Sequence, residues 1–257
     1  MGIYKIDDIK SHKNTYKDIP EKLLSYLEKN KIKNTKRDKL KQSWICENKL
    51  NKTDSHKFNS SVRELLNKIN ESNYDNIVSQ IDLLEIDSLV DLDTFIKILL
   101  EKVVREEKYA NIYAKLSEHL STIIVKENDK EYFFKKLLLA ECQKLFIKNT
   151  TQNNIRKTDA ISYITFLSEL FNCHMLSLDI IIGCYNILIN KASNNNLMTD
   201  MIITMLSITH KELYKRDNNK YNNILNKIKI LCDSKNISLR EKILLAELLT
   251  TVTNKIN

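Results

Sequence analysis

The sequence predicts an all-α fold: an α-solenoid of about five antiparallel helix pairs, preceded by a flexible basic N-terminal arm. The 257 residues include one proline, Pro20, and two glycines, Gly2 and Gly183, so residues that sharp turns and β-hairpins usually require are almost absent after residue 20. From residue 59 onward, apolar residues recur at helical spacing between short polar breaks. We therefore expect stacked amphipathic helices in residues 59–257 and a separate arm in residues 1–58.

The repeating part divides into ten amphipathic blocks with short links, which is typical of antiparallel helix pairs. The blocks are residues 60–69, 74–86, 92–106, 109–125, 131–148, 158–173, 177–192, 197–215, 221–234 and 239–255. A helical bundle without regular repeats is the alternative, because degenerate repeats leave little self-similarity in a sequence.

Polar residues at the starts of several blocks predict helix N-termini. Ser177 and Thr158 each precede an aspartate by one or two positions, and Ser238 is followed three residues later by Glu241. The last spacing is that of a capping box, in which the serine and glutamate side chains bind each other's backbone N–H groups.

The arm carries most of the net charge of +8. Residues 1–58 contain 15 Lys/Arg and 8 Asp/Glu, whereas residues 59–257 contain 26 and 25. Two short helical segments, 3–10 and 20–29, precede a lysine-rich polar stretch at 30–42. Such a stretch cannot bury enough apolar surface to offset its ordering entropy, so we expect the arm to be mobile in isolation.

Catalytic or metal-binding motifs are not evident in the sequence. Its cysteines lack the paired spacing of a zinc site or a disulfide framework, and its histidines lack metal-ligand spacing. Phosphate-cradling loops need clustered glycines, which are missing. The five cysteines are Cys46, Cys142, Cys173, Cys184 and Cys232, and the five histidines are His12, His56, His119, His174 and His210. We expect a binding protein with no cofactor and no catalytic residues, in a reducing compartment.

The lack of recognisable targeting signals in the sequence predicts a cytosolic location. The sequence has no signal-peptide core and no apolar stretch of membrane-spanning length, so no membrane association is expected.

Four stretches match one family in order and spacing. Residues 62–69, VRELLNKI, resemble the Val-Arg-x-x-Leu-Asn-Lys-Leu opening helix of the middle domain of translation initiation factor 4G, and Tyr74 stands at that family's phenylalanine position. Residues 95–104 with 109–116 are similar to the family's Ile-Phe-Glu-Lys-Ala and Tyr-Ala-x-Met/Leu helices. Together with the next two stretches, the resemblance covers about residues 58–256.

The third stretch contains the most recognisable family string. Residues 134–146, FKKLLLAECQKLF, resemble Phe-Arg-x-Leu-Leu-Leu-Asn-x-Cys-Gln-x-x-Phe, with Ala140 in place of the family asparagine. Residues 162–171, SYITFLSELF, followed by Met175 and Leu176, resemble Gly-Asn-Ile-x-Phe-Ile-Gly-Glu-Leu-Phe and Met-Leu. Here Ser162 and Ser168 replace both family glycines, so we expect slightly opened helix contacts.

This resemblance implies a HEAT-type scaffold that holds the DEAD-box RNA helicase called initiation factor 4A in an active-prone, half-open arrangement. In that family the helicase touches both ends of the crescent. The positions matching the first contact surface are Leu66, Ile69 and Tyr74, and those matching the basic end of the last repeat are Arg240 and Lys242. The i, i+3 spacing of Leu66 and Ile69 also suits plain core packing.

Trp44 is the single tryptophan and lies in the arm. A tryptophan in a mobile segment is either an anchor on the helical body or a hot-spot residue for a partner. Because the family also carries a tryptophan just upstream of its repeats, Trp44 is a further candidate for helicase binding.

The extreme N-terminus suggests a second partner. The segment from Tyr4 through Ile9 to Lys10 resembles the Tyr-x-x-x-x-Leu-Φ helix by which factor 4G binds the cap-binding factor 4E, with Ile9 in place of leucine and Lys10 in place of the apolar residue Φ. If this motif functions, the chain links cap recognition to a helicase.

The basic stretch of the arm suits contact with RNA phosphates or with an acidic protein. Seven Lys/Arg stand against Asp38 between Lys29 and Lys41, and few aromatic residues accompany them, which disfavours sequence-specific RNA reading. The candidate RNA-binding residues are Lys31, Lys33, Lys36, Arg37, Lys39 and Lys41. A solvated linker is the alternative interpretation.

Other scaffolds use the same repeats. The alternatives are a partner of the poly(A)-binding protein, a nonsense-mediated-decay scaffold, a nuclear cap-binding subunit, or a decoy that binds the helicase without promoting initiation. An enzyme is the least favoured class.

Overall fold

The computed structural model describes residues 54–152, 154–193 and 195–254. The predictions for residues 1–53, including the two short helices and every candidate residue of the arm, lie outside the described residues. Ten α-helices occupy the described part: α3 (Asp54–Lys68), α4 (Tyr74–Asp82), α5 (Leu89–Arg105), α6 (Ala110–His119), α7 (Phe134–Thr151), α8 (Lys157–Asn172), α9 (Leu178–Ala192), α10 (Asn196–Arg216), α11 (Asn218–Asp233) and α12 (Leu239–Asn254).

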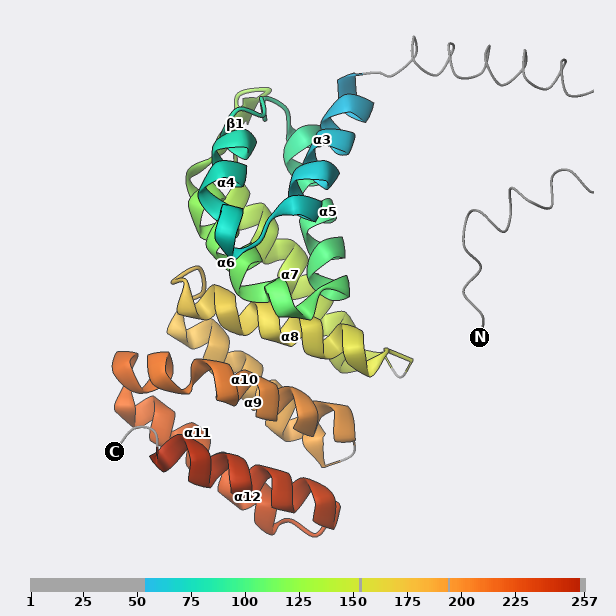
Figure 1. Cartoon of the computed structure of the whole chain (residues 1–257). Coiled ribbons are helices and arrows are strands. Elements are labelled where there is room, and N and C mark those ends of the chain that lie inside the picture. The colour runs from blue at the N-terminus through green and yellow to red at the C-terminus, as the bar shows by residue number, and fades with distance from the viewer. Residues whose placement is uncertain (1–53, 153, 194, 255–257) are drawn as a thin grey trace, which may run out of the picture. The chain divides into compact units, whose positions relative to one another are not determined.

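The helices from residue 57 onward stack as successive pairs, from α3 and α4 to α11 and α12 (Figure 1). The second helices of the pairs pack on one another, α6 on α8, α8 on α10 and α10 on α12, and the first helices do the same, α5 on α7 and α9 on α11. We call the two rows the first-helix layer (α3, α5, α7, α9, α11) and the second-helix layer (α4, α6, α8, α10, α12). The predicted HEAT-type solenoid of five helix pairs is confirmed, and the irregular bundle is excluded.

A constant register joins the last three pairs. Lys191 Nζ donates to the Thr150 carbonyl, Lys220 Nζ to Asp179 and Lys227 Nζ to Asn186, and each pair of residues is 41 positions apart. A repeat length of 41 residues therefore exists in the structure, although the sequence shows little self-similarity at that period.

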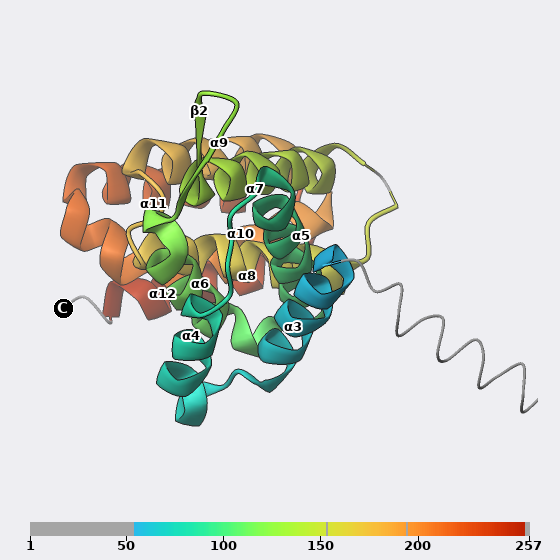
Figure 2. The same ribbon diagram turned by 90° about the horizontal axis from the view of Figure 1, so that it is seen from above.

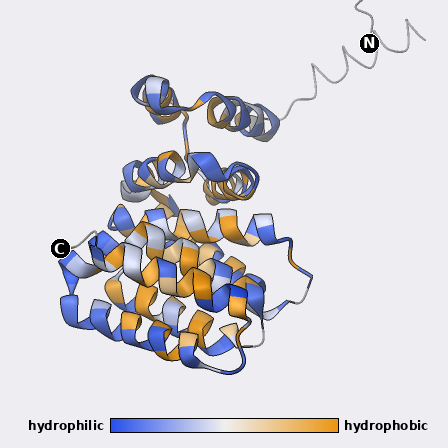
Figure 3. Ribbon diagram, turned by 60° about the horizontal axis from the view of Figure 1, so that its bottom comes forward, coloured by the Kyte–Doolittle hydropathy of each residue, from blue (hydrophilic) through white to orange (hydrophobic). Residues whose placement is uncertain are grey.

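The core follows the helical periodicity of the sequence. Apolar and polar segments alternate along each helix in Figure 3, and the apolar side chains form one continuous buried cluster. Three tyrosines are fully buried, and each hydroxyl has a partner. Tyr113 donates to Glu106 at 2.6 Å, Tyr163 to the Cys142 carbonyl at 2.6 Å, and Tyr185 pairs with Thr209 at 2.7 Å.

The serines at the family's glycine positions fit inside α8. Ser162 and Ser168 are 4% and 0% exposed, and their hydroxyls donate to the carbonyls of Thr158 and Ile164 one turn earlier. Their polar atoms are therefore satisfied within the helix.

A β-hairpin between α6 and α7 was not predicted. The apolar spacing predicted helices over 109–125 and 131–148, but α6 ends at His119 and antiparallel strands β1 (Ile124–Glu127) and β2 (Lys130–Phe133) follow (Figure 2). The two turn residues, Asn128 and Asp129, adopt φ of 51° and 60°. Asn and Asp tolerate this left-handed conformation, so the turn forms without glycine, and the expectation that scarce glycine excludes hairpins was wrong.

Candidate partner-binding surfaces

The first candidate surface is at α3, where the family resemblance placed Leu66 and Ile69. Both side chains are buried, at 1% and 3% exposed, and they belong to the core cluster. In this structure they position α3 by packing, and their side chains offer no contact area to a partner.

The solvent side of α3 is polar and is joined to α5. Arg63 pairs with Glu101 at 2.9 Å, and Lys102 donates to Asn67 at 2.8 Å. Lys102 also pairs with Glu106. These contacts fix the angle between the first two helix pairs, so α3 presents a defined row of charged and amide groups to solvent.

Glu106, which directly follows α5, is a partly buried member of this set of contacts. Burial opposes its ionisation, but hydrogen bonds from Lys102 and Tyr113 outweigh burial and lower the pKa of Glu106. Burial and the hydrogen bond to Glu106 raise the pKa of Tyr113. The carboxylate is therefore held ionised as a fixed acceptor between α5 and α6.

Tyr74, the third predicted residue of this end, is the first residue of α4. Asn70 and Asn73 form a reciprocal capping box immediately before it, which sets the direction of the chain as it enters α4. The Tyr74 side chain is half-buried. Burial, with smaller contributions from Cys173 and nearby carboxylates, raises the pKa of Tyr74 to about 12, so the phenol stays protonated. Its partly exposed ring is available to a partner, unlike Leu66 and Ile69.

The second candidate surface is at the start of α12, in the last helix pair. Ser238 and Glu241 form the predicted capping box: Ser238 N–H donates to Glu241 at 3.0 Å and Glu241 N–H donates to Ser238 at 3.4 Å. Arg240 is exposed and Lys242 is half-buried.

Two residues of this surface were missed by sequence reasoning. Leu239 and Ile243 lie one turn apart and are 75% and 57% exposed, on either side of Arg240 in sequence. The buried stripe of α12 runs through Glu241, Leu245, Leu248 and Val252, so a helical projection of this block would have placed Leu239 and Ile243 off the core side. Exposed aliphatic side chains beside an arginine are typical of protein interfaces.

The structure does not bring the two surfaces together. Tyr74 belongs to the first helix pair and Arg240 to the last, and the intervening pairs separate them (Figure 1). A partner that contacts both must span the stack.

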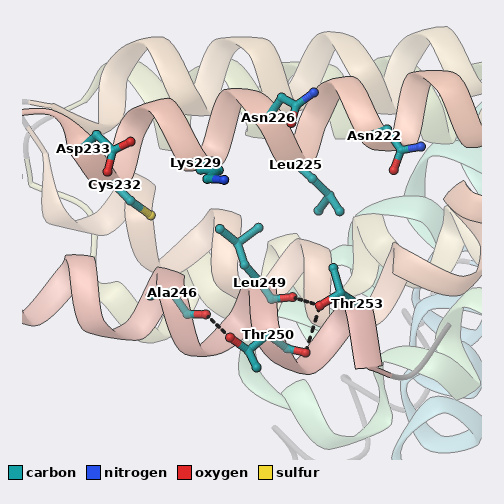
Figure 4. Close-up of a pocket in the computed structure, with 10 residues that line it drawn as sticks. All are labelled: Asn222, Leu225, Asn226, Lys229, Cys232, Asp233, Ala246, Leu249, Thr250 and Thr253. Carbon is teal, nitrogen blue, oxygen red and sulfur yellow. Dashed lines mark hydrogen bonds between the residues drawn. The ribbon is translucent and has the colours of Figure 1, made fainter. Parts of the chain in front are cut away.

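The groove between α11 and α12 is a third concave feature, of about 650 Å³ (Figure 4). Leu225 and Leu249 point into it from opposite helices, and the rest of the lining is mostly polar, with asparagine, lysine, aspartate and threonine side chains beside Cys232 and Ala246. Residues 41 positions earlier on α9, Ile181, Tyr185 and Leu188, are buried, whereas the corresponding residues of α11 are Asn222, Asn226 and Lys229. At these three positions α11 is therefore polar where α9 is apolar.

Reactive groups do not converge in the part of the chain described. Burial raises the pKa of the Cys142 and Cys184 thiols to about 12, which keeps them protonated and poorly nucleophilic. Within the same residues, no three His, Cys, Asp or Glu side chains are placed to hold a metal ion. Of the described helices, none has the length and hydropathy of a bilayer span.

Comparison with known proteins identifies a family. Residues 60–255 match the MIF4G domain. Eukaryotic translation initiation factor 4G of Arabidopsis thaliana is 31% identical over 87 residues, and eukaryotic translation initiation factor 4 gamma 3 of Mus musculus is 31% identical over 97 residues; these matches cover 33% and 37% of this chain. Eukaryotic translation initiation factor 4 gamma 1 of Mus musculus is 22% identical over an alignment of 222 residues, which covers 73% of this chain.

The chain spans a small part of these relatives, 5%, 6% and 14% of their lengths. Among solved structures, the MIF4G domain of Trypanosoma cruzi translation initiation factor EIF4G5 superimposes with a TM-score of 0.54 at 14% identity, covering 77% of this chain and 96% of that one. This likeness supports the fold.

Proposed function

Because the chain belongs to the MIF4G domain family and is similar to translation initiation factor 4G, we propose that it is a non-catalytic cytosolic scaffold that binds the DEAD-box RNA helicase initiation factor 4A. The family match over residues 60–255 carries this proposal. The two separate surfaces support it, because a two-domain helicase is large enough to reach both ends of a stack of helix pairs.

In this proposal Tyr74 contacts the helicase at the first pair, and Arg240, Lys242, Leu239 and Ile243 contact it at the last. The aliphatic pair supplies apolar area, and Arg240 supplies charge and hydrogen-bond donors. Leu66 and Ile69 contribute indirectly by holding α3 against the core. Trp44 remains a proposed additional contact.

The arm, residues 1–58, is proposed to recruit further partners, and residues 59–257 to form the helicase-binding body. Tyr4, Ile9 and Lys10 are assigned to the cap-binding factor 4E. Lys31, Lys33, Lys36, Arg37, Lys39 and Lys41 are assigned to RNA phosphates. Full-length chains carrying Tyr4→Ala with Ile9→Ala should lose factor 4E and keep the helicase; equal factor 4E binding by this variant and wild type would remove the assignment.

Isothermal titration calorimetry of the full chain with factor 4A from its own cell tests the main proposal. We expect saturable binding with one helicase per chain. Heat no greater than that of dilution, at protein concentrations of tens of micromolar, would reject the helicase assignment and favour another scaffold with these repeats. If the helicase binds the chain but its RNA-dependent ATPase activity does not rise, the chain would instead be a decoy that binds the helicase without promoting initiation.

A further inference from the structure

A groove of about 320 Å³ lies between α9 and α11 in the first-helix layer. Asn186, Ile189 and Asn190 line it from α9, and Lys227 and Ile230 line it from α11. The hydrogen bond from Lys227 Nζ to Asn186 Oδ1 bridges the two helices at 2.7 Å. Ile230 is 70% exposed, so an aliphatic side chain stands at the edge of this groove with no cover from the described residues.

The solvent side of α9 continues this apolar surface. Ile180 and Ile187 are 47% and 41% exposed, and Gly183 lies between them on the same side of the helix. A Cβ added at Gly183 would meet no atom within 4 Å. Glycine weakens a helix interior relative to alanine, and no contact within the described structure compensates for it. A bare backbone at this point allows another helix to approach closely.

The charge of the first-helix layer indicates what kind of partner fits. Helices α7, α9 and α11 together contain eight lysines and three acidic residues, whereas α8, α10 and α12 of the same three pairs contain six basic and six acidic residues. Lys148 and Lys229 are exposed, and neither has a carboxylate within salt-bridge distance among the described residues. The layer that carries Ile180, Ile187 and Ile230 is therefore also the more basic of the two.

A nucleic acid would use this surface poorly. Helices α7, α9 and α11 contain no arginine, and their aromatic residues Phe134, Phe146, Tyr185 and Tyr221 are all buried, so groups that stack on bases are missing from the surface of these three helices. Exposed isoleucines contribute nothing to phosphate binding. They do suit the apolar face of a partner helix, and the lysines suit acidic residues beside that face.

We propose that the α9–α11 groove and the adjoining ridge of Ile180, Gly183 and Ile187 dock an amphipathic helix of a partner protein, with apolar residues at i, i+3 or i+4 and i+7 and acidic residues flanking them. This surface is distinct from the helicase surfaces on Tyr74 and at the start of α12. The scaffold thereby acquires a docking site for a second protein that leaves both helicase surfaces free.

A phage-displayed library of helical peptides, selected on the full chain, tests this inference. Recovered peptides are synthesised with a fluorescein label and titrated by anisotropy against wild type, Gly183→Leu, Ile230→Ser and Lys227→Glu. Gly183→Leu is the sharpest variant, because a Cβ at residue 183 meets no atom within 4 Å, so the substitution begins in open space and places a bulky side chain on the ridge. Val90→Ser is the matched control, since Val90 is also exposed, at 62%, but lies on α5 and belongs to none of the proposed surfaces.

We expect the selection to recover acidic amphipathic peptides whose affinity falls as the salt concentration rises. Each groove variant should weaken their binding about tenfold or more, and Val90→Ser should bind them with wild-type affinity. The inference is overturned if no peptide is recovered, if recovered peptides lack acidic residues, or if Gly183→Leu and Ile230→Ser bind as wild type does. It is also overturned if the groove variants instead abolish binding of a 20-nucleotide poly(U) RNA or self-association in sedimentation. A helicase titration of Gly183→Leu separates the two proposals, because the helicase should bind this variant normally.

Discussion

Lys227 on α11 donates a hydrogen bond of 2.7 Å to Asn186 on α9, 41 residues earlier in the chain. The same separation joins Lys220 to Asp179 and Lys191 to Thr150. Three consecutive pairs share one register, and each pair contacts mainly its neighbours. A substitution that destabilises one pair should therefore affect the stability of the neighbouring pairs first, and stability can be analysed pair by pair.

Tyr163 should contribute strongly to the central pair. Its buried hydroxyl donates to the Cys142 carbonyl and so joins α8 to α7. Tyr163→Phe removes this buried hydrogen bond between the two helices and should lower the free energy of unfolding by about 1–2 kcal/mol, measured by urea denaturation. Tyr214→Phe is the control, because Tyr214 is 40% exposed, and it should unfold as wild type does. Equal losses in both variants would contradict this assignment.

Gly183→Ala should stabilise the chain. The added methyl group meets no neighbour within 4 Å, and alanine favours the helix interior over glycine by about 0.5–1 kcal/mol. Urea denaturation should show a higher midpoint with an unchanged slope. A lower midpoint would contradict this prediction, because it would mean that the added methyl group disturbs a packing contact of Gly183.

Glu106 should make stability depend on pH in the acidic range. Its pKa in the folded chain lies below the ordinary value of 4.5, so the ionised carboxylate stabilises the fold at neutral pH, and this contribution is lost as pH falls through the lowered pKa. Glu106→Gln should lower the free energy of unfolding by about 1 kcal/mol at pH 7, and the difference from wild type should shrink below pH 4. A difference that stays constant from pH 7 to pH 3 would show that the charge of Glu106 is not the cause.

The hairpin turn offers a test of the unexpected strands. Asn128 and Asp129 both have positive φ, and Asn-Gly suits such a turn better than Asn-Asp. Asp129→Gly should raise the free energy of unfolding by about 0.5 kcal/mol, whereas Asp129→Val should lower it. The opposite order in thermal melts would argue against a turn of this type.

The helices were predictable because burial on one face imposes a period that the sequence displays directly. The hairpin was not, because its turn uses Asn128 and Asp129 in a conformation that glycine adopts more readily. Ser238 and Glu241 were recognised because a capping box is a local pattern.

The candidate surfaces were only partly predictable. Arg240 is exposed, as its charge suggested, but Leu66 and Ile69 are apolar residues that a resemblance alone cannot assign to the core or to an interface. A helical projection of residues 239–255 could have found Leu239 and Ile243, because both lie opposite the buried stripe of α12. The α9–α11 groove depends on two helices 41 residues apart, a relationship that local patterns do not contain.

The central claim, a helicase scaffold with a contact at each end, is tested most directly by calorimetric titration of factor 4A into the full chain and its surface variants. We predict that Tyr74→Ala and Arg240→Glu each weaken binding by about tenfold, that the double variant weakens it further, and that Lys148→Glu, a charge-matched change on α7, has no effect. Wild-type affinity in the double variant, with intact folding in thermal melts, would contradict the account.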